Sequence, residues 1–330
     1  MAREYSSMES MVMNIFLTGA TGFIGINLIP KLLKYNHTVI ALKRVSSDLS
    51  KLQLYIDNRN LIFYNLEENQ LSRIFQETRI DMVIHLATYY RKSHIKDEID
   101  NMIHSNIEFP TEILQQMIEH GVRYFINTGT FFEYALESNN PITETCRINP
   151  YNLYAATKVA FEDILKYYIE NYSISAATLR LFAPYGPFDH KSKIIPYIIK
   201  NVSEKIPIKF NSSGFQKWDY VFIQDVTEAF KKTIEFIINN DVKHEVFNIG
   251  SGKTVSLREV FQYINQIAKT KIEATWGQNT NKEINYVCAD ITKTKKLLKW
   301  EPCFDIYKGL EITYKWFTKN EIFGAQNENY

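Results

Sequence analysis

Tyr154 and Lys158 stand four residues apart in the segment 151–172, which the apolar pattern predicts to be one long helix. Residues at i and i+4 project from the same face of a helix, so the phenol and the ammonium are neighbours. A nearby cation favours the phenolate, and we therefore expect Lys158 to lower the pKa of Tyr154 enough for proton exchange near neutral pH. Tyr and Lys also occur at this spacing by chance, so the prediction of acid or base catalysis depends on further motifs.

A third candidate residue, Thr130, follows a predicted strand at 123–127 that runs on through Thr128 and Gly129. In open α/β sheets, functional sites form at the carboxyl ends of the strands. The hydroxyl of Thr130 is suited to hydrogen-bond a carbonyl or hydroxyl group of a substrate. We predict that Thr130, Tyr154 and Lys158 are the catalytic residues.

A glycine-rich turn, Thr-Gly-Ala-Thr-Gly-Phe-Ile-Gly at 18–25, lies between an apolar run at 15–17 and an apolar-periodic segment at 26–33. Glycines permit a tight turn and a close approach to an anion, and the N–H groups that open the following helix attract phosphate. The spacing of Gly19, Gly22 and Gly25 is G-x-x-G-x-x-G, unlike the standard G-x-G-x-x-G. A plain strand-to-helix connection is the alternative, but the Tyr154/Lys158 pair downstream favours a dinucleotide site.

The next predicted strand, at 38–42, ends at Lys43 and Arg44. In dinucleotide-binding folds the end of this strand reaches the adenosine ribose, where an acidic residue suits a free 2′-hydroxyl and a cation suits a 2′-phosphate. Lys43 and Arg44 therefore favour NADP(H) over NAD. A solvated strand edge is the alternative interpretation of two basic residues.

Predicted strands and helices alternate along the first half of the chain, which indicates a parallel, doubly wound α/β sheet. The strands are expected at 15–17, 38–42, 61–64, 82–87, 123–130 and 175–182, and the helices at 26–33, 67–78, 99–120 and 151–172. Beyond 183 we expect helices at 194–202 and 225–238, strands at 221–223 and 245–250, and a capping box from Ser256 to Glu259.

The predicted fold is therefore a Rossmann sheet with a smaller, interleaved C-terminal substrate-binding lobe. The expected dinucleotide-binding domain covers 14–182 with a returning segment at 219–250. The substrate-binding lobe covers 183–218 and 251–320, and residues 1–13 and 321–330 are expected to be tails.

The composition is that of an ordinary soluble protein, with 330 residues, 45% hydrophobic residues and a formal net charge of +1. A balance so close to neutral gives no reason to expect nucleic-acid or membrane partners. The three cysteines are far apart and match no metal spacing, and no apolar run reaches the length of a membrane span. We expect a cytoplasmic protein with reduced thiols and no metal.

Over residues 14–310 the chain resembles the extended short-chain dehydrogenases/reductases of the nucleotide-sugar epimerase/dehydratase type. The likeness rests on the turn at 18–25, His85-Leu86-Ala87, Asn106, Tyr154-x-x-x-Lys158, Pro184-Tyr185-Gly186-Pro187 and Asn248-Ile249-Gly250. The resemblance implies that Tyr154 is the acid/base, that Lys158 holds the nicotinamide ribose, and that Thr130 orients the reacting oxygen. It also implies a homodimer. The expected cofactor-binding residues are Gly19, Thr21, Gly22, Phe23, Ile24, Gly25, Lys43, Arg44, Leu86, Ala87, Thr88, Asn106, Thr128, Tyr154, Lys158, Phe182 and Pro184.

Within this family the chain is most similar to the CDP-abequose and CDP-paratose synthases, through the segments 84–88, 125–128 and 194–199. Those enzymes reduce the 4-keto group of a CDP-3,6-dideoxyhexulose with NADPH. The similarity implies a role in deoxysugar biosynthesis for surface polysaccharide, such as the O-antigen of lipopolysaccharide.

Other reactions of the family need residues that are missing from this chain. The dehydratases carry an Asp-Glu pair after the active-site Thr, where this chain has Phe131 and Phe132. The 3,5-epimerase/reductases need a Cys and a His, but no Cys lies near Thr130 and Lys193 stands where the His is expected. Reduction of a 4-keto sugar with NADPH and 4-epimerisation with tightly held NAD remain. A non-catalytic NADP-sensing protein is a third possibility.

The clamp for the substrate diphosphate is the main departure from the family. Trp218 occupies the position of one expected phosphate-binding Arg, and Thr280 occupies the other. Lys217, Lys282, Lys193 and Arg180 are candidate replacements, and the nucleotide stays open between CDP, dTDP and another carrier. The expected substrate-binding residues are Tyr89, Tyr90, Thr130, Phe131, Phe132, Lys193, Lys217 and Trp218.

Overall fold

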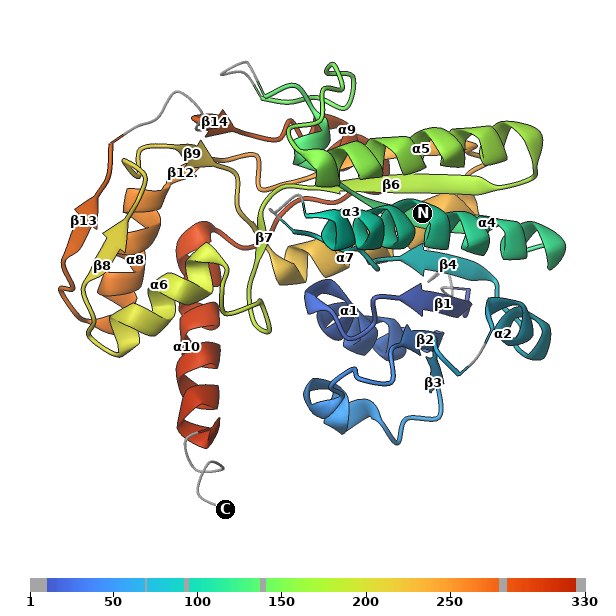
Figure 1. The fold of residues 1–330 in the computed structure, drawn as a ribbon, viewed down its shortest axis with the longest axis horizontal. Helices are drawn as coiled ribbons and strands as arrows, with labels where there is room; N and C mark the ends of the chain where they lie inside the picture. Colours follow the sequence, from blue (N-terminus) through green and yellow to red (C-terminus); the bar gives the residue numbers. More distant parts are fainter. Residues whose placement is uncertain (1–10, 69, 92–94, 137–140, 279–283, 325–330) are drawn as a thin grey trace, which may run out of the picture.

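The computed structural model describes residues 11–68, 70–91, 95–136, 141–278 and 284–324. Its centre is a seven-stranded parallel sheet with the strand order β3-β2-β1-β4-β5-β6-β11, which confirms the predicted doubly wound Rossmann sheet (Figure 1). The strands are β1 (Asn14–Thr18), β2 (Thr38–Lys43), β3 (Leu61–Asn65), β4 (Met82–His85), β5 (Tyr124–Thr130), β6 (Ser175–Leu181) and β11 (His244–Ile249).

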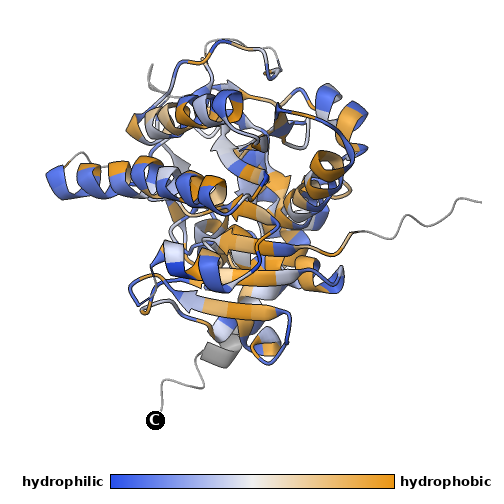
Figure 2. Ribbon diagram, turned by 90° about the vertical axis from the view of Figure 1, so that its right-hand side faces the viewer, coloured by the Kyte–Doolittle hydropathy of each residue, from blue (hydrophilic) through white to orange (hydrophobic). Residues whose placement is uncertain are grey.

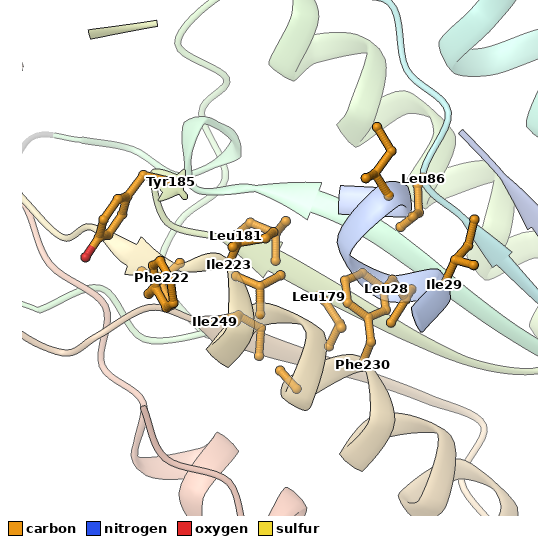
Figure 3. Packing of buried hydrophobic residues seen from close by; sticks show 14 of the residues in the cluster. Leu28, Ile29, Leu86, Leu179, Leu181, Tyr185, Phe222, Ile223, Phe230 and Ile249 are labelled. Carbon is orange, nitrogen blue, oxygen red and sulfur yellow. The ribbon is translucent and has the colours of Figure 1, made fainter. Parts of the chain in front are cut away.

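Helices cover both faces of this sheet because the strands are apolar on both sides. Ile15 and Leu17 face one core with α1 (Phe23–Lys34) and α7 (Ile223–Asn239). Phe16, which alternates with them, faces a second core with α2 (Leu71–Glu77), α4 (Phe109–Glu119) and α5 (Leu153–Asn171). Figure 3 shows the first core, where Leu28 of α1 and Phe230 of α7 lie against Leu179 of β6. Hydrophobic residues gather on the central strands, and much of the outer helical surface is hydrophilic (Figure 2).

The helix predicted at 99–120 is interrupted. It consists of α3 (Lys96–Ile103), one π-helical turn η2 (His104–Glu108), and α4. Pro110 has no N–H to donate to the carbonyl group four residues earlier, which favours the change of hydrogen-bonding register. Such π-bulges are frequent at functional sites, and this one contains Asn106.

Short strands and further helices lie beyond the carboxyl ends of the main strands (Figure 1). The remaining strands are β7 (Pro184–Tyr185), β8 (Ile208–Phe210), β9 (Lys217–Trp218), β10 (Val221–Phe222), β12 (Val255–Ser256), β13 (Ala274–Trp276) and β14 (Tyr286–Val287). The remaining helices are α6 (Ile194–Ser203), α8 (Leu257–Ala268), α9 (Thr292–Leu298) and α10 (Ile306–Gly324), with the 3₁₀ turns η1 (Ser50–Tyr55) and η3 (Phe131–Glu133).

The predicted capping box is confirmed at the start of α8, where Ser256 and Glu259 bond each other reciprocally. No helix in the described part of the chain is both long enough and apolar enough to cross a membrane.

Candidate active site

The glycine turn lies at the carboxyl end of β1, next to β4, where the strand order reverses. Gly19 has φ +67°, and a Cβ there would lie 2.7 Å from the Ala87 nitrogen. A Cβ on Gly25 would lie 2.4 Å from the Gly19 oxygen, so the turn and the start of α1 pack too closely for a side chain. The first turn of α1 carries no acidic residue and no side-chain cap. The free N–H groups and the glycine cradle fit the pyrophosphate of a dinucleotide.

The Thr18 side chain holds the residues that follow β4 next to the glycine turn. Its hydroxyl accepts hydrogen bonds from the backbone N–H groups of Leu86 and Ala87, at 3.2 and 3.1 Å. It also lies 2.9 Å from Nδ1 of His85. The His85 ring packs between aromatic side chains, and burial lowers the pKa of His85 well below its usual value. His85 is therefore a packed strand residue beside the nucleotide cradle.

Two cations stand at the carboxyl end of β2. Lys43 is half-buried and donates a hydrogen bond from Nζ to Oδ1 of Asn65 on the neighbouring strand β3. Arg44 is exposed, and its backbone N–H donates to Ser47. Two carboxylates lie close by: Glu67 accepts the N–H of Val45 at 2.9 Å, and Glu68 accepts a hydrogen bond from Nδ2 of Asn65. The strand end therefore presents positive side chains where the adenosine ribose is expected.

Helix α5 carries the predicted catalytic pair, and Asn152 caps its first turn by accepting the N–H of Ala155 at 2.9 Å. Lys158 is 3% exposed, and burial lowers the pKa of its ammonium group to about 8, although Glu133 opposes the change. Tyr154 is hydrogen-bonded to Thr88, and the ring of Tyr90 meets it edge-on at 4.9 Å.

The predicted effect of Lys158 on Tyr154 is wrong for the chain as described. Burial raises the pKa of the Tyr154 phenol far above its usual value, and Glu133 and Tyr90 add to the rise. The hydrogen bond with Thr88 opposes it, and Lys158 is not among the groups that shift this pKa. Burial removes water from the phenolate, and this cost outweighs the stabilisation by Lys158 that the spacing of the two residues predicted. Tyr154 therefore holds its proton in the chain as described.

Thr130 is the last residue of β5, at a strand end as predicted, and it is also the N-cap of η3. Its backbone N–H donates to Oε1 of Glu133 at 2.7 Å, and its hydroxyl oxygen accepts the N–H of Phe132 in a long contact of 3.4 Å. Because that contact uses a lone pair, the hydroxyl proton stays available to a substrate oxygen. Thr128, two residues earlier, has a buried hydroxyl with no hydrogen-bonding partner among the described residues.

Asn106, a predicted cofactor-binding residue, holds the loop after β4 against α5. Its Oδ1 accepts from the Thr88 hydroxyl at 3.0 Å and from the Tyr89 N–H at 2.8 Å. Its Nδ2 donates to the Tyr89 carbonyl group at 3.0 Å and to the Thr157 hydroxyl at 2.9 Å. All four hydrogen-bonding positions of the amide are used. Asn106 therefore positions Thr88, which in turn meets Tyr154.

Aromatic side chains pack together next to Thr130 in the chain. The rings of Phe131 and Phe132 meet Trp218 of β9 at centroid distances of 5.6 and 6.1 Å, both edge-on. Phe132 also stacks on Tyr151, three residues before Tyr154, at 5.6 Å. The indole N–H of Trp218 donates to the Ile284 carbonyl group at 3.1 Å. We call Phe131, Phe132, Tyr151 and Trp218 the aromatic wall.

Three of the candidates for a phosphate clamp lie among the described residues. Arg180 is only 3% exposed and is bound by Glu133 and Glu162, so its proposed role as a replacement clamp is wrong. Lys193 precedes α6 next to the buried Asp189, and Lys217 is an exposed residue of β9.

Several other predicted residues occupy particular places. Thr280 and Lys282 lie outside the described residues. Phe182 is fully buried against Phe131, and Pro184 begins β7. Thr21, Phe23 and Ile24 are partly exposed around the start of α1.

Sequence reasoning missed the buried ion cluster behind Thr130. Arg180 donates from Nε to Glu133 at 2.6 Å and from Nη2 to both oxygens of Glu162 at 3.0 and 2.8 Å. A charged residue inside the apolar strand 175–181 was the available signal, because such a residue needs a buried partner.

A doubly wound sheet, a glycine cradle at its switch point and a Tyr-x-x-x-Lys pair on one helix together define a protein of the short-chain dehydrogenase/reductase type. Residues 15–250 match the model of the NAD dependent epimerase/dehydratase family, and the chain belongs to this family. It is therefore an enzyme of the epimerase or oxidoreductase type from an NAD(P)-dependent family.

Curated relatives cover almost the whole chain. The UDP-glucuronate 4-epimerase of Thermodesulfobacterium geofontis is 28% identical, with 92% of this chain and 96% of that protein aligned. The CDP-abequose synthase of Salmonella muenchen is also 28% identical, over 90% of this chain and 95% of the relative. The dTDP-4-dehydro-6-deoxyglucose reductase of Escherichia coli is 26% identical, over 93% and 98%.

Solved structures agree with the fold along its full length. UDP-glucose 4-epimerase of Thermotoga maritima with UDP-glucose has a TM-score of 0.84 and 27% identity, covering 94% of this chain and all of that chain. UDP-glucuronic acid 4-epimerase of Bacillus cereus, in complex with UDP-glucuronic acid and NAD, has a TM-score of 0.85 and 25% identity, covering 93% and 100%. The relatives thus include both 4-epimerases and a 4-ketoreductase.

Proposed function

We propose that this chain reduces the C4 keto group of a nucleotide-linked 4-keto-6-deoxy or 3,6-dideoxy hexose with NADPH, as a step of deoxysugar biosynthesis for surface polysaccharide. The observation that carries the choice of reduction over epimerisation is the pair of cations, Lys43 and Arg44, at the ribose end of β2. They suit a 2′-phosphate. A net reductase consumes a cofactor that exchanges with solution, whereas a 4-epimerase recycles one that it retains.

The residues of the active site support proton donation. When bound, the cofactor supplies a hydride equivalent to C4 of the sugar. Tyr154 keeps its proton because its phenol is buried, so it is the group that protonates the C4 oxygen. Thr130 offers its hydroxyl to the same oxygen, as a second hydrogen-bond donor. The glycine turn at 18–25 holds the pyrophosphate, and Lys158 holds the nicotinamide ribose.

The aromatic wall supports a deoxygenated sugar. Phe132 and Trp218 are partly exposed, Phe131 is buried against both of them, and the N–H of Trp218 is already bonded to Ile284. Such a surface favours methyl and methylene groups over hydroxyl groups, since a hydroxyl group placed there loses its hydrogen bonds to water. Tyr89, Tyr90, Lys193 and Lys217 complete the proposed substrate-binding set, with CDP or dTDP as the carrier.

The 4-epimerase with tightly bound NAD is the second candidate, because the solved relatives above are 4-epimerases that share the fold. The two candidates differ in how the cofactor is held. We expect the purified protein to oxidise NADPH when CDP- or dTDP-linked 4-keto-6-deoxy sugars are added. NAD retained through purification, together with interconversion of UDP-glucose and UDP-galactose without net oxidation, would establish the epimerase instead. NADPH binding without either reaction would favour a sensor.

We further propose a homodimer in the cytoplasm, with a nucleotide-binding domain at 14–182 and 219–250 and a substrate-binding lobe at 183–218 and 251–320. Limited proteolysis and light scattering test the division and the assembly.

A further inference from the structure

Four ionisable side chains are buried together behind the catalytic threonine. Glu133 is 1% exposed, Lys158 and Arg180 are each 3% exposed, and Glu162 is 4% exposed. In their ionised forms the two cations and the two carboxylates sum to zero. Buried charges are tolerated only when they are paired, so each member of this set depends on the others.

Arg180 of β6 joins the two carboxylates. Its Nε donates to Glu133 at 2.6 Å, and its Nη2 donates to both oxygens of Glu162 at 3.0 and 2.8 Å. The Tyr134 ring also lies against the guanidinium group, at 4.7 Å. One guanidinium charge thus serves two carboxylates, and the half-exposed Lys166 lies 3.7 Å from Glu162 at the edge of the cluster. Lys158 is the remaining buried cation of the set.

Glu133 connects this cluster to both parts of the catalytic apparatus. Its Oε1 accepts the backbone N–H of Thr130 at 2.7 Å, and η3, which contains Glu133, packs against α5. On α5, Glu162 follows Lys158 by four residues and therefore lies on the same helical face. Arg180 thus ties the turn after Thr130 to the helical face that carries Lys158.

The backbone beside Thr130 leaves room for this arrangement. A Cβ on Gly129 would lie 2.8 Å from Oε1 of Glu133 and 2.9 Å from Cγ of Arg180. Because Gly129 has no side chain, the Glu133 carboxylate and the Arg180 guanidinium group can meet beside the backbone that precedes Thr130.

We propose that Glu133 is a positioning residue that holds the Thr130 backbone and acts as the counter-ion that keeps Lys158 protonated. This inference rests on the proposed function, because it assigns the proton state that a reduction requires. The charges that face these groups come from several elements. Glu133 of η3 and His85 of β4 interact electrostatically with Lys158, and Glu133 and Tyr90 do so with Tyr154. Glu133 in turn interacts with Arg180 of β6 and Glu162 of α5.

The electrostatics agree with this geometry. Burial lowers the pKa of Lys158 to about 8, and Glu133 is the group that opposes the fall. Glu133 also helps to raise the pKa of Tyr154, so it favours the proton on both members of the pair. The pKa of Glu133 itself is raised to about 7, by burial and by Glu162, while Arg180 and the Thr130 N–H oppose the rise.

The test is the pH dependence of NADPH binding, measured by nicotinamide fluorescence from pH 6 to 10 on the full chain. Binding by the wild-type protein should weaken above about pH 8 as Lys158 loses its proton, and K158M should lack this dependence. We expect E133Q to move the midpoint at least about one pH unit lower, because an opposite charge nearby shifts a pKa by about 1 to 3 units. The matched control E162Q breaks the same guanidinium pairing without touching Thr130, and it should not move the midpoint downward.

Equal midpoints for E133Q and wild type would overturn the proposal, and so would equal downward shifts for E133Q and E162Q. If E133Q does not fold, E133D keeps the carboxylate on a shorter side chain. It should keep the midpoint near that of the wild type, and a drop of about one unit would contradict the assigned role. Because binding needs no sugar, a protein that shows the expected shifts but reduces no 4-keto sugar would refute the proposed function alone.

Discussion

Removing the cations at the end of β2 should change which cofactor the protein prefers. The double variant K43A/R44A deletes both side chains that we assign to the 2′-phosphate. Lys43 is half-buried and already held by Asn65, so its ammonium group is preordered for a ligand, whereas Arg44 is exposed and loses entropy on binding.

The size of the effect follows from these contacts. A hydrogen bond to a charged group contributes about 1.5 to 3 kcal/mol, and solvent screening reduces the contribution of the exposed Arg44. We therefore expect a combined loss of about 3 kcal/mol for NADPH. Since about 1.4 kcal/mol is a factor of ten, the preference for NADPH over NADH should fall about 100-fold. Affinity for NADH, which lacks the phosphate, should change by less than about threefold, an energy of about 0.6 kcal/mol.

Fluorescence titration of NADPH and NADH gives both dissociation constants at one ionic strength. The control variant K34A removes an exposed cation from the far end of α1, where no phosphate is expected, and should leave the ratio unchanged. A ratio unaltered in K43A/R44A would refute the assignment of these residues. Stronger binding of NADH than of NADPH by the wild-type protein would refute it as well.

Two other variants test the cradle and the buried lysine. In G25A the new Cβ would lie 2.4 Å from the Gly19 oxygen, so the turn must shift. NADPH affinity should then fall at least about tenfold. Unchanged affinity in a titration would argue against the phosphate cradle. Because burial lowers the pKa of Lys158 to about 8 from an ordinary 10.5, the unfolded chain binds more protons between these values. The free energy of unfolding of the wild type relative to K158M should therefore rise between about pH 8 and about pH 10.5, by up to about 3 kcal/mol. Urea titrations measure this difference, and a difference that does not change with pH would contradict the burial of a charged Lys158.

The sequence was enough to predict the sheet, because β1 to β6 are local apolar runs whose alternation with helices leaves few topologies. The glycine turn was predictable for the same reason, since its chemistry lies in adjacent residues. Helix 99–120 was predicted as one regular element, because hydrophobic periodicity does not distinguish a π-turn at Asn106 from the α-helix around it. Strands of two residues, such as β9, are too short to leave a pattern.

The candidate active site was also predictable only in part. Tyr154, Lys158 and Thr130 were predicted from spacing and strand ends, and their catalytic roles stay a prediction. The direction of the Tyr154 pKa shift depends on burial, which spacing does not report. The contact from Arg180 to Glu133 joins residues 47 positions apart in the chain, and no short motif connects them. The four hydrogen bonds of the Asn106 amide join residues that are 17 to 51 positions apart in the chain, so spacing alone does not predict them.

The central claim is that Tyr154 gives its proton to a 4-keto sugar while NADPH is consumed. The most direct measurement is NADPH oxidation by wild type and by Y154F with CDP- and dTDP-linked 4-keto-6-deoxy sugars. We expect turnover by the wild type, and a loss of about 100-fold or more in Y154F with NADPH affinity unchanged. Equal turnover by the two proteins, or no NADPH oxidation by the wild type with any of these sugars, would contradict the claim.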